Sequence, residues 1–117
     1  MALRKPSEAE AKLLDHLIAL ADQGLPRLEP DRAALSVETM NDGGMGSLRL
    51  FPPGTRGKAR LFGRRVSSWE FDDLDGVRVL VSLVVDADER LYELELWKSD
   101  FGRLLQLPEF DDATPSE

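Results

Sequence analysis

Apolar residues recur at helical spacing near the N-terminus and at alternate positions through most of the remaining chain. Ser7 and Glu10 stand three residues apart, as in a capping box that satisfies free amides at a helix start. Gly24 can adopt the left-handed conformation that ends a helix, and Pro26 cannot continue one. The pattern therefore predicts a helix over residues 7–23. Its apolar stripe consists of Leu13, Leu14, Leu17, Ile18 and Ala21.

Beyond Pro30, apolar and polar residues alternate in a way that is typical of half-buried strands. Asn41-Asp42-Gly43-Gly44 is a strong hairpin signal, because Asn, Asp and Gly tolerate positive φ angles. Gly63 interrupts the third alternating segment, which predicts a bulge there. The predicted strands span residues 35–40, 46–51, 58–71, 77–85 and 91–98, and a short helical turn is expected at residues 101–106.

The fourth predicted strand carries apolar residues on both faces, because Leu80 and Val84 lie opposite the row that begins at Val77. Such a strand is expected to lie inside a sheet rather than at its edge. The elements together predict an α+β fold, with one N-terminal amphipathic helix packed on a curved antiparallel meander sheet of about five strands. One helix cannot cover such a sheet. The C-terminal segment, the curvature of the sheet or another chain should cover the rest.

The length of 117 residues fits one domain of ordinary size. We expect a single α+β domain over residues 1–110 and a disordered acidic tail over residues 111–117. The chain has no cysteine, which excludes disulfides, thiolate metal sites and cysteine nucleophiles. It has neither the apolar region of a signal peptide nor an apolar run of the roughly 20 residues that span a membrane. These features predict a cytoplasmic protein with no membrane partner.

Charge is distributed unevenly along the chain. The net charge of −7 disfavours nucleic acid as a partner. Residues 70–117 carry fourteen acids and four cations, whereas residues 36–69 carry six cations and two acids. These six cations lie from Arg49 to Arg65, a stretch without any acid. They either complement the acidic strands across the sheet or form a patch that binds an anion or a partner.

The sequence has few patterns that indicate catalysis or metal binding. His16 is the only histidine and lies in the predicted helix beside the apolar stripe, which favours a structural role. Asp73 and Asp75, followed by Gly76, resemble part of a calcium loop, but Val84 occupies the position of the closing acid. We therefore predict no catalytic residue, no metal and no cofactor, and we do not expect an enzyme.

The last predicted strand ends at Trp97, which alternates with Leu96, so their side chains point to opposite faces of the sheet. One of them is expected to lie at the less covered surface. Trp97 either packs in the core or is exposed, with Glu95, Lys98 and Asp100 at its rim, where it would anchor an interface.

Three segments resemble a family of small uncharacterised bacterial proteins. They are residues 75–77 (Asp-Gly-Val), 82–86 (Ser-Leu-Val-Val-Asp) and 91–101, which ends in Trp-Lys-Ser-Asp-Phe; the Asp-Gly-Gly-Met-Gly-Ser turn at 42–47 is also similar. In that pattern a turn glycine stands where this chain has Glu89-Arg90, and Asp stands in place of Glu95. The resemblance implies a domain of unknown function and supplies no catalytic residue.

These features lead to the hypothesis of a non-enzymatic domain that binds another protein or a second copy of itself. An immunity or toxin-neutralising protein with a basic partner is one alternative. Another is a small-molecule binder or an enzyme acting on an anionic ligand, with Glu93 and Glu95 as acid-base groups. The predicted binding residues across these hypotheses are Trp97, Asp100, Arg60, Arg64 and Arg65.

Overall fold

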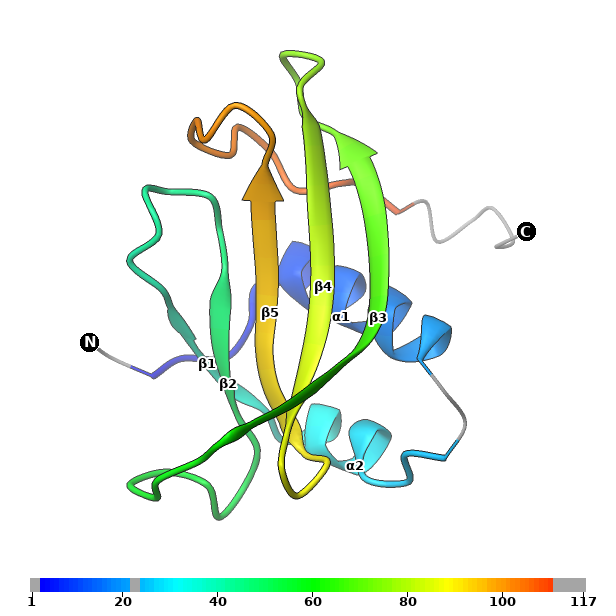
Figure 1. Ribbon diagram of the computed structural model, residues 1–117, viewed down its shortest axis with the longest axis vertical. Helices are drawn as coiled ribbons and strands as arrows, with labels where there is room; N and C mark the ends of the chain where they lie inside the picture. The colour runs from blue at the N-terminus through cyan, green and yellow to red at the C-terminus, as the bar shows by residue number, and fades with distance from the viewer. Residues whose placement is uncertain (1–2, 22–23, 111–117) are drawn as a thin grey trace.

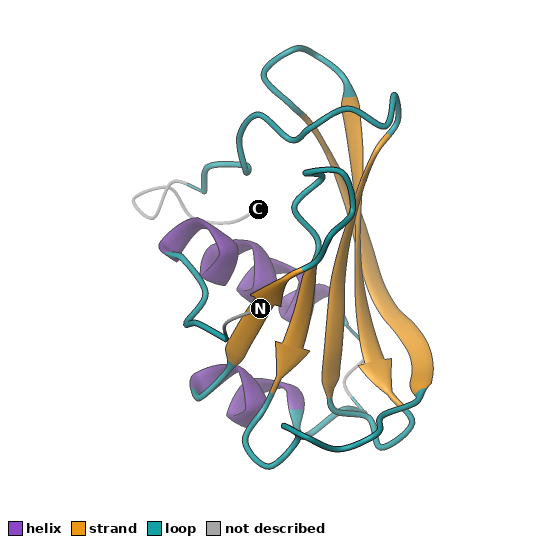
Figure 2. Ribbon diagram, turned by 90° about the vertical axis from the view of Figure 1, so that its left-hand side faces the viewer, coloured by secondary structure: helices purple, strands orange, loops and turns teal. Residues whose placement is uncertain are grey.

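The computed structural model describes residues 3–21 and 24–110, and it has two layers (Figure 1). The helices are α1 (Glu8–Leu20) and α2 (Leu28–Ala33), and the strands are β1 (Ser36–Thr39), β2 (Leu48–Phe51), β3 (Phe62–Asp72), β4 (Arg78–Asp86) and β5 (Leu91–Lys98). Figure 2 shows both helices on one side of the sheet, so no described helix covers the other face. The predicted α+β fold, with an N-terminal helix on a five-stranded antiparallel sheet, is confirmed.

Helix α1 begins as its sequence predicts. The Ser7 hydroxyl accepts a hydrogen bond from the Glu10 amide (3.1 Å), and the Glu10 carboxylate accepts one from the Ser7 amide (2.8 Å). The helix ends at Leu20 with Ala21 as its C-cap, so the predicted end at a left-handed Gly24 is wrong. Residues 22 and 23 of the predicted helix lie outside the described residues, as does the predicted tail at 111–117. Among the residues that the structure describes, no helix is long and apolar enough to cross a membrane.

Helix α2 was not predicted, although its sequence contains a signal. Pro30 is its third residue, where no intrahelical partner exists for an amide, and Glu29 and Asp31 place negative charge in the first turn. Leu28 points into the core, where its side chain is 3 % exposed. Together with the C-terminal segment, α2 covers the part of the sheet that α1 leaves open. From that segment, Leu104, Leu107 and Phe110 pack against the core.

The strand order is β1-β2-β5-β4-β3, which differs from the predicted meander at one connection. Strands β3, β4 and β5 follow one another as predicted, but β2 pairs with β5 and not with β3. Leu48 lies opposite Leu94 and Arg49 lies opposite Glu93, so an apolar pair and an ion pair of 2.9 Å favour this arrangement. The loop after β2 carries the chain towards β3, whose first half crosses in front of β4 and β5 in Figure 1.

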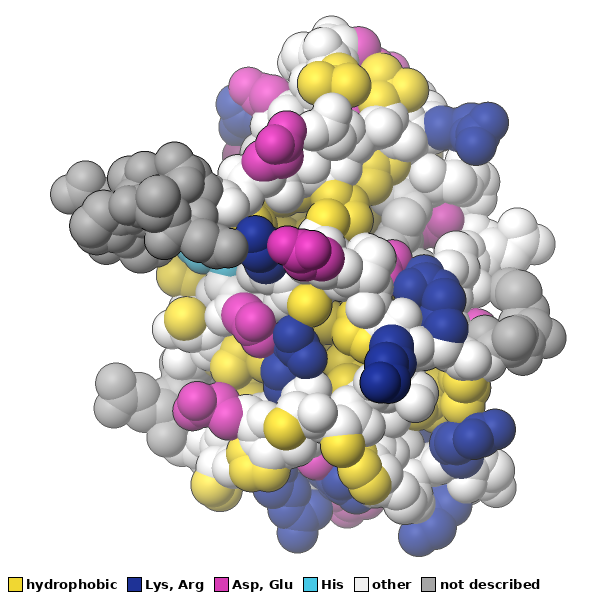
Figure 3. Space-filling view, turned by 180° about the vertical axis from the view of Figure 1, so that it is seen from behind, with side chains coloured by type: hydrophobic (Ala, Val, Ile, Leu, Met, Phe, Trp, Pro, Cys, Tyr) yellow, Lys and Arg dark blue, Asp and Glu magenta, His cyan; other side chains and the backbone are white. Residues whose placement is uncertain are grey.

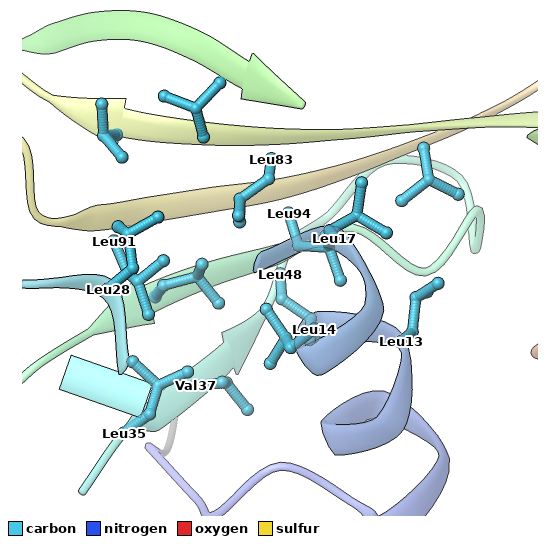
Figure 4. Packing of buried hydrophobic residues seen from close by; sticks show 14 of the residues in the cluster. Leu13, Leu14, Leu17, Leu28, Leu35, Val37, Leu48, Leu83, Leu91 and Leu94 are labelled. Carbon is cyan, nitrogen blue, oxygen red and sulfur yellow. The ribbon is translucent and has the colours of Figure 1, made fainter. Parts of the chain in front are cut away.

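The core lies between the helices and one face of the sheet (Figure 4). Leucines of α1 meet alternate residues of the strands, as the two periodicities require. The largest apolar side chains with less than 2 % exposure are Leu13, Leu14, Leu17, Leu48, Leu50, Leu83, Leu91 and Leu94.

Residues 101–110 contain no helix, so the helical turn predicted at 101–106 is wrong. The physical reason lies in the turn between β3 and β4. The Asp73 carboxylate accepts hydrogen bonds from the amides of Leu105 (2.8 Å) and Gln106 (3.1 Å). A distant carboxylate therefore takes the place of the local carbonyls that a helical turn would use.

Glu89, in the turn between β4 and β5, has a φ of 61°, a left-handed conformation in which most side chains are strained. Replacing Glu89 with Gly is expected to raise the free energy of unfolding by about 1 kcal/mol. The loss of the long, half-exposed ion pair with Arg64 (3.6 Å) offsets little of this gain. Urea titration measures the change. Asp88→Gly in the same turn is the control, because Asp88 has no positive φ, and it should not stabilise.

Candidate functional site

Three segments that overlap the family-like pattern meet at one end of the sheet, the upper end in Figure 1. They are the glycine turn at residues 42–47, the acidic turn at 72–76 and the segment at 97–106. The Leu104 amide donates to the Gly44 carbonyl (2.9 Å), and Leu105 and Gln106 donate to Asp73. Residues far apart in the sequence therefore form one bonded unit.

Lys98 does not lie at the exposed rim of Trp97 as predicted, because its side chain turns inward and forms the centre of this unit. Its side chain is only 2 % exposed, and its ammonium group donates to Asp73 (2.9 Å), Asp75 (2.7 Å) and the Arg103 carbonyl (3.0 Å). The hydrogen bond to Asp75, followed by that to Asp73, raises the pKa of Lys98 against the opposing effect of burial. The acidic turn that resembles part of a calcium loop thus holds an internal cation.

Asp73 accepts four hydrogen bonds at a position with no exposed side-chain surface. One oxygen accepts from the amides of Leu74 (2.8 Å) and Gln106 (3.1 Å), and the other from Lys98 (2.9 Å) and the Leu105 amide (2.8 Å). Burial by itself raises the pKa of Asp73, but Lys98 and the three amides outweigh it and lower the pKa to about 2.

Lowering the pH is expected to destabilise the protein through Asp73. Its pKa is about 2 in the folded protein and about 3.9 in an unfolded chain, so the unfolded state takes up the proton first. The stabilising contribution is complete above about pH 4 and is lost progressively between about pH 4 and pH 2. Urea titrations at a series of pH values measure this loss. Asp73→Asn should weaken the pH dependence in that window, and an unchanged dependence would contradict this origin.

The glycine turn forms a hairpin whose polar groups are used for hydrogen bonds within the protein. The Asp42 carboxylate accepts hydrogen bonds from the amides of Met45 (3.1 Å) and Ser47 (3.0 Å). The buried Ser47 hydroxyl bonds both the amide (2.9 Å) and the carbonyl (3.2 Å) of Leu96. The predicted hairpin is confirmed.

Large apolar side chains are exposed around this bonded unit. Trp97 lies on the open face of the sheet opposite Leu80 and is 45 % exposed. Its ring contacts that of Phe101 edge to face at 5.7 Å. We use the name Trp97 surface for the exposed residues at this end, which are Leu74, Trp97, Phe101 and Leu105.

The backbone after Trp97 makes a tight turn that leaves the Phe101 side chain exposed. Phe101 has a φ of 62° and is 70 % exposed, a combination that contributes little to a fold and strains the chain. The Asp100 carboxylate accepts a hydrogen bond from the Gly102 amide (2.8 Å) and so stabilises the tight turn. Asp100, predicted at the rim of an interface, thus also positions its neighbour.

The predicted arginines do not gather around Trp97. Arg60 is 7 % exposed and donates to Asp86 (2.9 Å) and to the carbonyls of Leu50 and Leu91, at the other end of the sheet. Trp97 lies opposite Leu80 of β4, whereas Arg64 lies opposite Val85 of the same strand. Leu80 and Val85 are five residues apart, which is roughly 17 Å along the strand. Arg65 follows Arg64 in β3 and lies opposite Val84.

The basic stretch complements the acidic strands, which is the first of the two interpretations of its charges. Four of its six cations pair with acids of β4, β5 and their connecting turn. The pairs are Arg49–Glu93 (2.9 Å), Arg60–Asp86 (2.9 Å), Arg64–Glu89 (3.6 Å) and Arg65–Glu95 (3.9 Å). The other two cations, Arg56 and Lys58, are exposed in the loop before β3.

The other groups considered for catalysis, His16 and Glu93, contact neighbouring side chains of the fold. His16 packs against Trp69 (4.5 Å between ring centres) and Phe110 (5.1 Å). Burial raises the pKa of Glu93, although the guanidinium of Arg49 opposes this. Within the described residues, no group of three or more His, Cys, Asp or Glu side chains could hold a metal ion.

A hollow of about 780 Å³ lies between α1 and α2, and apolar side chains are visible among charged ones on this side of the molecule in Figure 3. Its lining includes Asp15 and Arg32, which pair with each other at 2.9 Å. Because these charges neutralise each other, the described residues that line the hollow offer no unpaired cation for an anionic ligand.

A family model described as a domain of unknown function, DUF6984, matches residues 3–108. Searches of curated proteins and of solved structures each found no match.

Proposed function

This chain belongs to the DUF6984 family, a domain of unknown function, and we propose that it is a non-enzymatic protein-binding domain whose contact surface is the Trp97 surface. The single observation that carries the proposal is Phe101. A bulky residue at a left-handed φ strains the backbone by roughly 1 kcal/mol or more. Phe101 is also 70 % exposed, so the fold gains little core packing in return.

The elements that carry the Trp97 surface are held in place by hydrogen bonds, which favours a role in binding. Trp97 belongs to β5, and the segment after it is tied to the acidic turn through Lys98 and Asp73. Aromatic side chains held rigidly before association lose less conformational entropy on binding, which favours affinity. Tryptophan and other large aromatic residues are also frequent at the centres of protein interfaces.

The charges around the Trp97 surface favour a partner with a basic rim. Asp100 is exposed beside Phe101, and Glu95 is 44 % exposed on the strand that carries Trp97. The row across the open face continues from Trp97 through Leu80 to Glu70. These acids would attract a basic protein, as an immunity-type function would require.

The test is a quantitative pull-down from a lysate of the source organism with wild type and a Trp97→Ser/Phe101→Gly variant. The glycine relieves the strained φ at residue 101, so the variant is expected to fold while its retention of a partner falls at least about 10-fold. Leu20→Ser is the matched control, because Leu20 is 50 % exposed on α1, which lies on the other side of the sheet from Trp97. It should retain the same partner as wild type.

A second copy of the chain is the other partner that this surface could bind. Light scattering would then show a mass near twice 13.1 kDa for wild type and the control, and a monomer for the double variant. A partner or dimer that all three proteins retain equally would overturn the proposal. So would a monomeric wild type that captures nothing.

A further inference from the structure

A second exposed surface lies at the opposite end of the sheet from Trp97, at the bottom of Figure 1. It is formed by the loop before β3 and by the first residues of that strand. The Ala87 amide of the β4–β5 turn donates to the Leu61 carbonyl (2.9 Å), and Phe62 lies opposite Asp86. We use the name basic tip for its exposed side chains, which are Arg56, Lys58, Leu61, Phe62 and Arg64.

The basic tip combines two unusually exposed apolar side chains with cations. Leu61 is 73 % exposed and Phe62 is 62 % exposed, which is more than Trp97. Neither Arg56 nor Lys58 forms an ion pair with another described residue. The remaining cations of the basic stretch are engaged by acids of this chain, so these two are the ones whose charge is directed outwards.

The loop that carries the tip is ordered by internal hydrogen bonds. Thr55 is 5 % exposed, and its hydroxyl (2.7 Å) and amide (3.2 Å) both donate to the Pro52 carbonyl. Arg60 fixes the other end of the loop through Asp86 and the Leu50 carbonyl (2.6 Å). Arg60 immediately precedes Leu61. Its buried hydrogen bonds therefore fix the backbone from which Leu61 and Phe62 project into solvent.

We propose that the basic tip docks an acidic protein segment that carries apolar side chains. Charge complementarity supports this partner, because Arg56 and Lys58 are exposed and form no ion pair with another described residue. The net charge of −7 disfavours a nucleic acid or an anionic bilayer, because these ligands extend over the acidic remainder of the protein. A short acidic segment interacts mainly with charges within the Debye length, which is about 8 Å at physiological salt. This surface is separate from the Trp97 surface, and the inference does not depend on the function proposed for that surface.

The contact is expected to be made by side chains and not by addition of a strand. Strand β3 is an edge strand, but its pairing with β4 shifts register between Phe62 and Arg64 and again between Arg65 and Ser67. Such bulges interrupt the regular row of backbone groups that a new strand would pair with. Recognition then rests on the apolar pair and on the charges around it.

The experiment is a selection of a phage-displayed random peptide library on the immobilised protein, followed by affinity measurements with the selected peptides. We expect a class of peptides rich in Asp and Glu with Leu or Phe. Their affinity should fall about 10-fold or more both for Arg56→Glu/Lys58→Glu and for Leu61→Ser/Phe62→Ser. The control Lys5→Glu/Arg27→Glu changes two exposed cations outside the tip by the same charge and should have a much smaller effect.

Selected peptides without an excess of acids would overturn the inference, as would acidic peptides that bind both tip variants as well as they bind the control. Peptides that respond only to Trp97→Ser/Phe101→Gly would support the Trp97 surface alone and would also overturn it. A membrane role would replace it if vesicles of phosphatidylserine and phosphatidylcholine bound the wild type, the tip variants did not bind them, and no acidic peptide was selected.

Discussion

Replacing Asp73 with Asn is expected to lower the free energy of unfolding by about 3 to 5 kcal/mol, as measured by urea titration. Each carboxylate oxygen of Asp73 accepts two hydrogen bonds. An amide group has only one acceptor atom, so in either orientation its NH₂ group would face two donors. The substitution also leaves the buried Lys98 ammonium with one carboxylate partner in place of two. A loss of this size is a large fraction of the stability of an ordinary domain.

Asp75→Asn is the matched control, because Asp75 contacts the same ammonium from a more exposed position. Its side chain is 38 % exposed, and among the described residues it accepts only from Lys98 (2.7 Å) and the Val77 amide (3.1 Å). Water can solvate an amide there, so the loss of stability should be clearly smaller than for Asp73→Asn. Equal losses at the two positions would show that the attraction of Lys98, and not the burial of Asp73, determines the effect.

Variants near the buried Lys98 allow an effect on stability to be distinguished from an effect on binding at the Trp97 surface. Asp73→Asn should loosen the turn between β3 and β4 together with the segment after β5, and so reduce stability and binding together. Trp97→Ser/Phe101→Gly should reduce binding while the fold remains stable. The two variants thus distinguish a residue that supports the surface from residues that make contact.

The parts of the fold that were predicted correctly depend on local signals. The capping box of Ser7 and Glu10, the hairpin at the glycine turn and the span of β5 each follow from residues that are neighbours in the sequence. Gly63 likewise predicted the irregularity that occurs in β3. In each case, the backbone conformation is determined within a few residues.

The parts that were missed depend on contacts between distant residues. The pairing of β2 with β5 and the extended course of residues 101–110 are both stabilised by groups far away in the sequence. The same is true of the candidate site. Lys98 continues the inward alternation of Leu94 and Leu96, and this pattern indicates that its side chain is buried. The residue type indicates the opposite, because lysine is rarely buried. Only the fold shows that an acidic turn lies above it.

Replacing Gly63 with Ala is expected to destabilise the protein by at least about 3 kcal/mol, for a reason that is geometric rather than conformational. A Cβ atom at Gly63 would lie 2.2 Å from the Asp86 carbonyl oxygen and 2.8 Å from that of Val85. Both contacts are with backbone atoms of β4, so no side chain can move aside. The start of β3 would have to shift, which would also disturb the hydrogen bonds of Arg60 and the position of the basic tip.

Gly24→Ala is the control for this substitution, because a Cβ atom at Gly24 would meet nothing within 4 Å and its φ is not in the left-handed range. Alanine reduces the freedom of the unfolded chain, so this variant should be neutral or stabilising by about 0.4 to 1 kcal/mol. Thermal or urea unfolding of the two variants measures the difference directly. If Gly63→Ala were as stable as Gly24→Ala, β3 could not approach β4 as closely as described, and the loop before it would not be fixed by that contact.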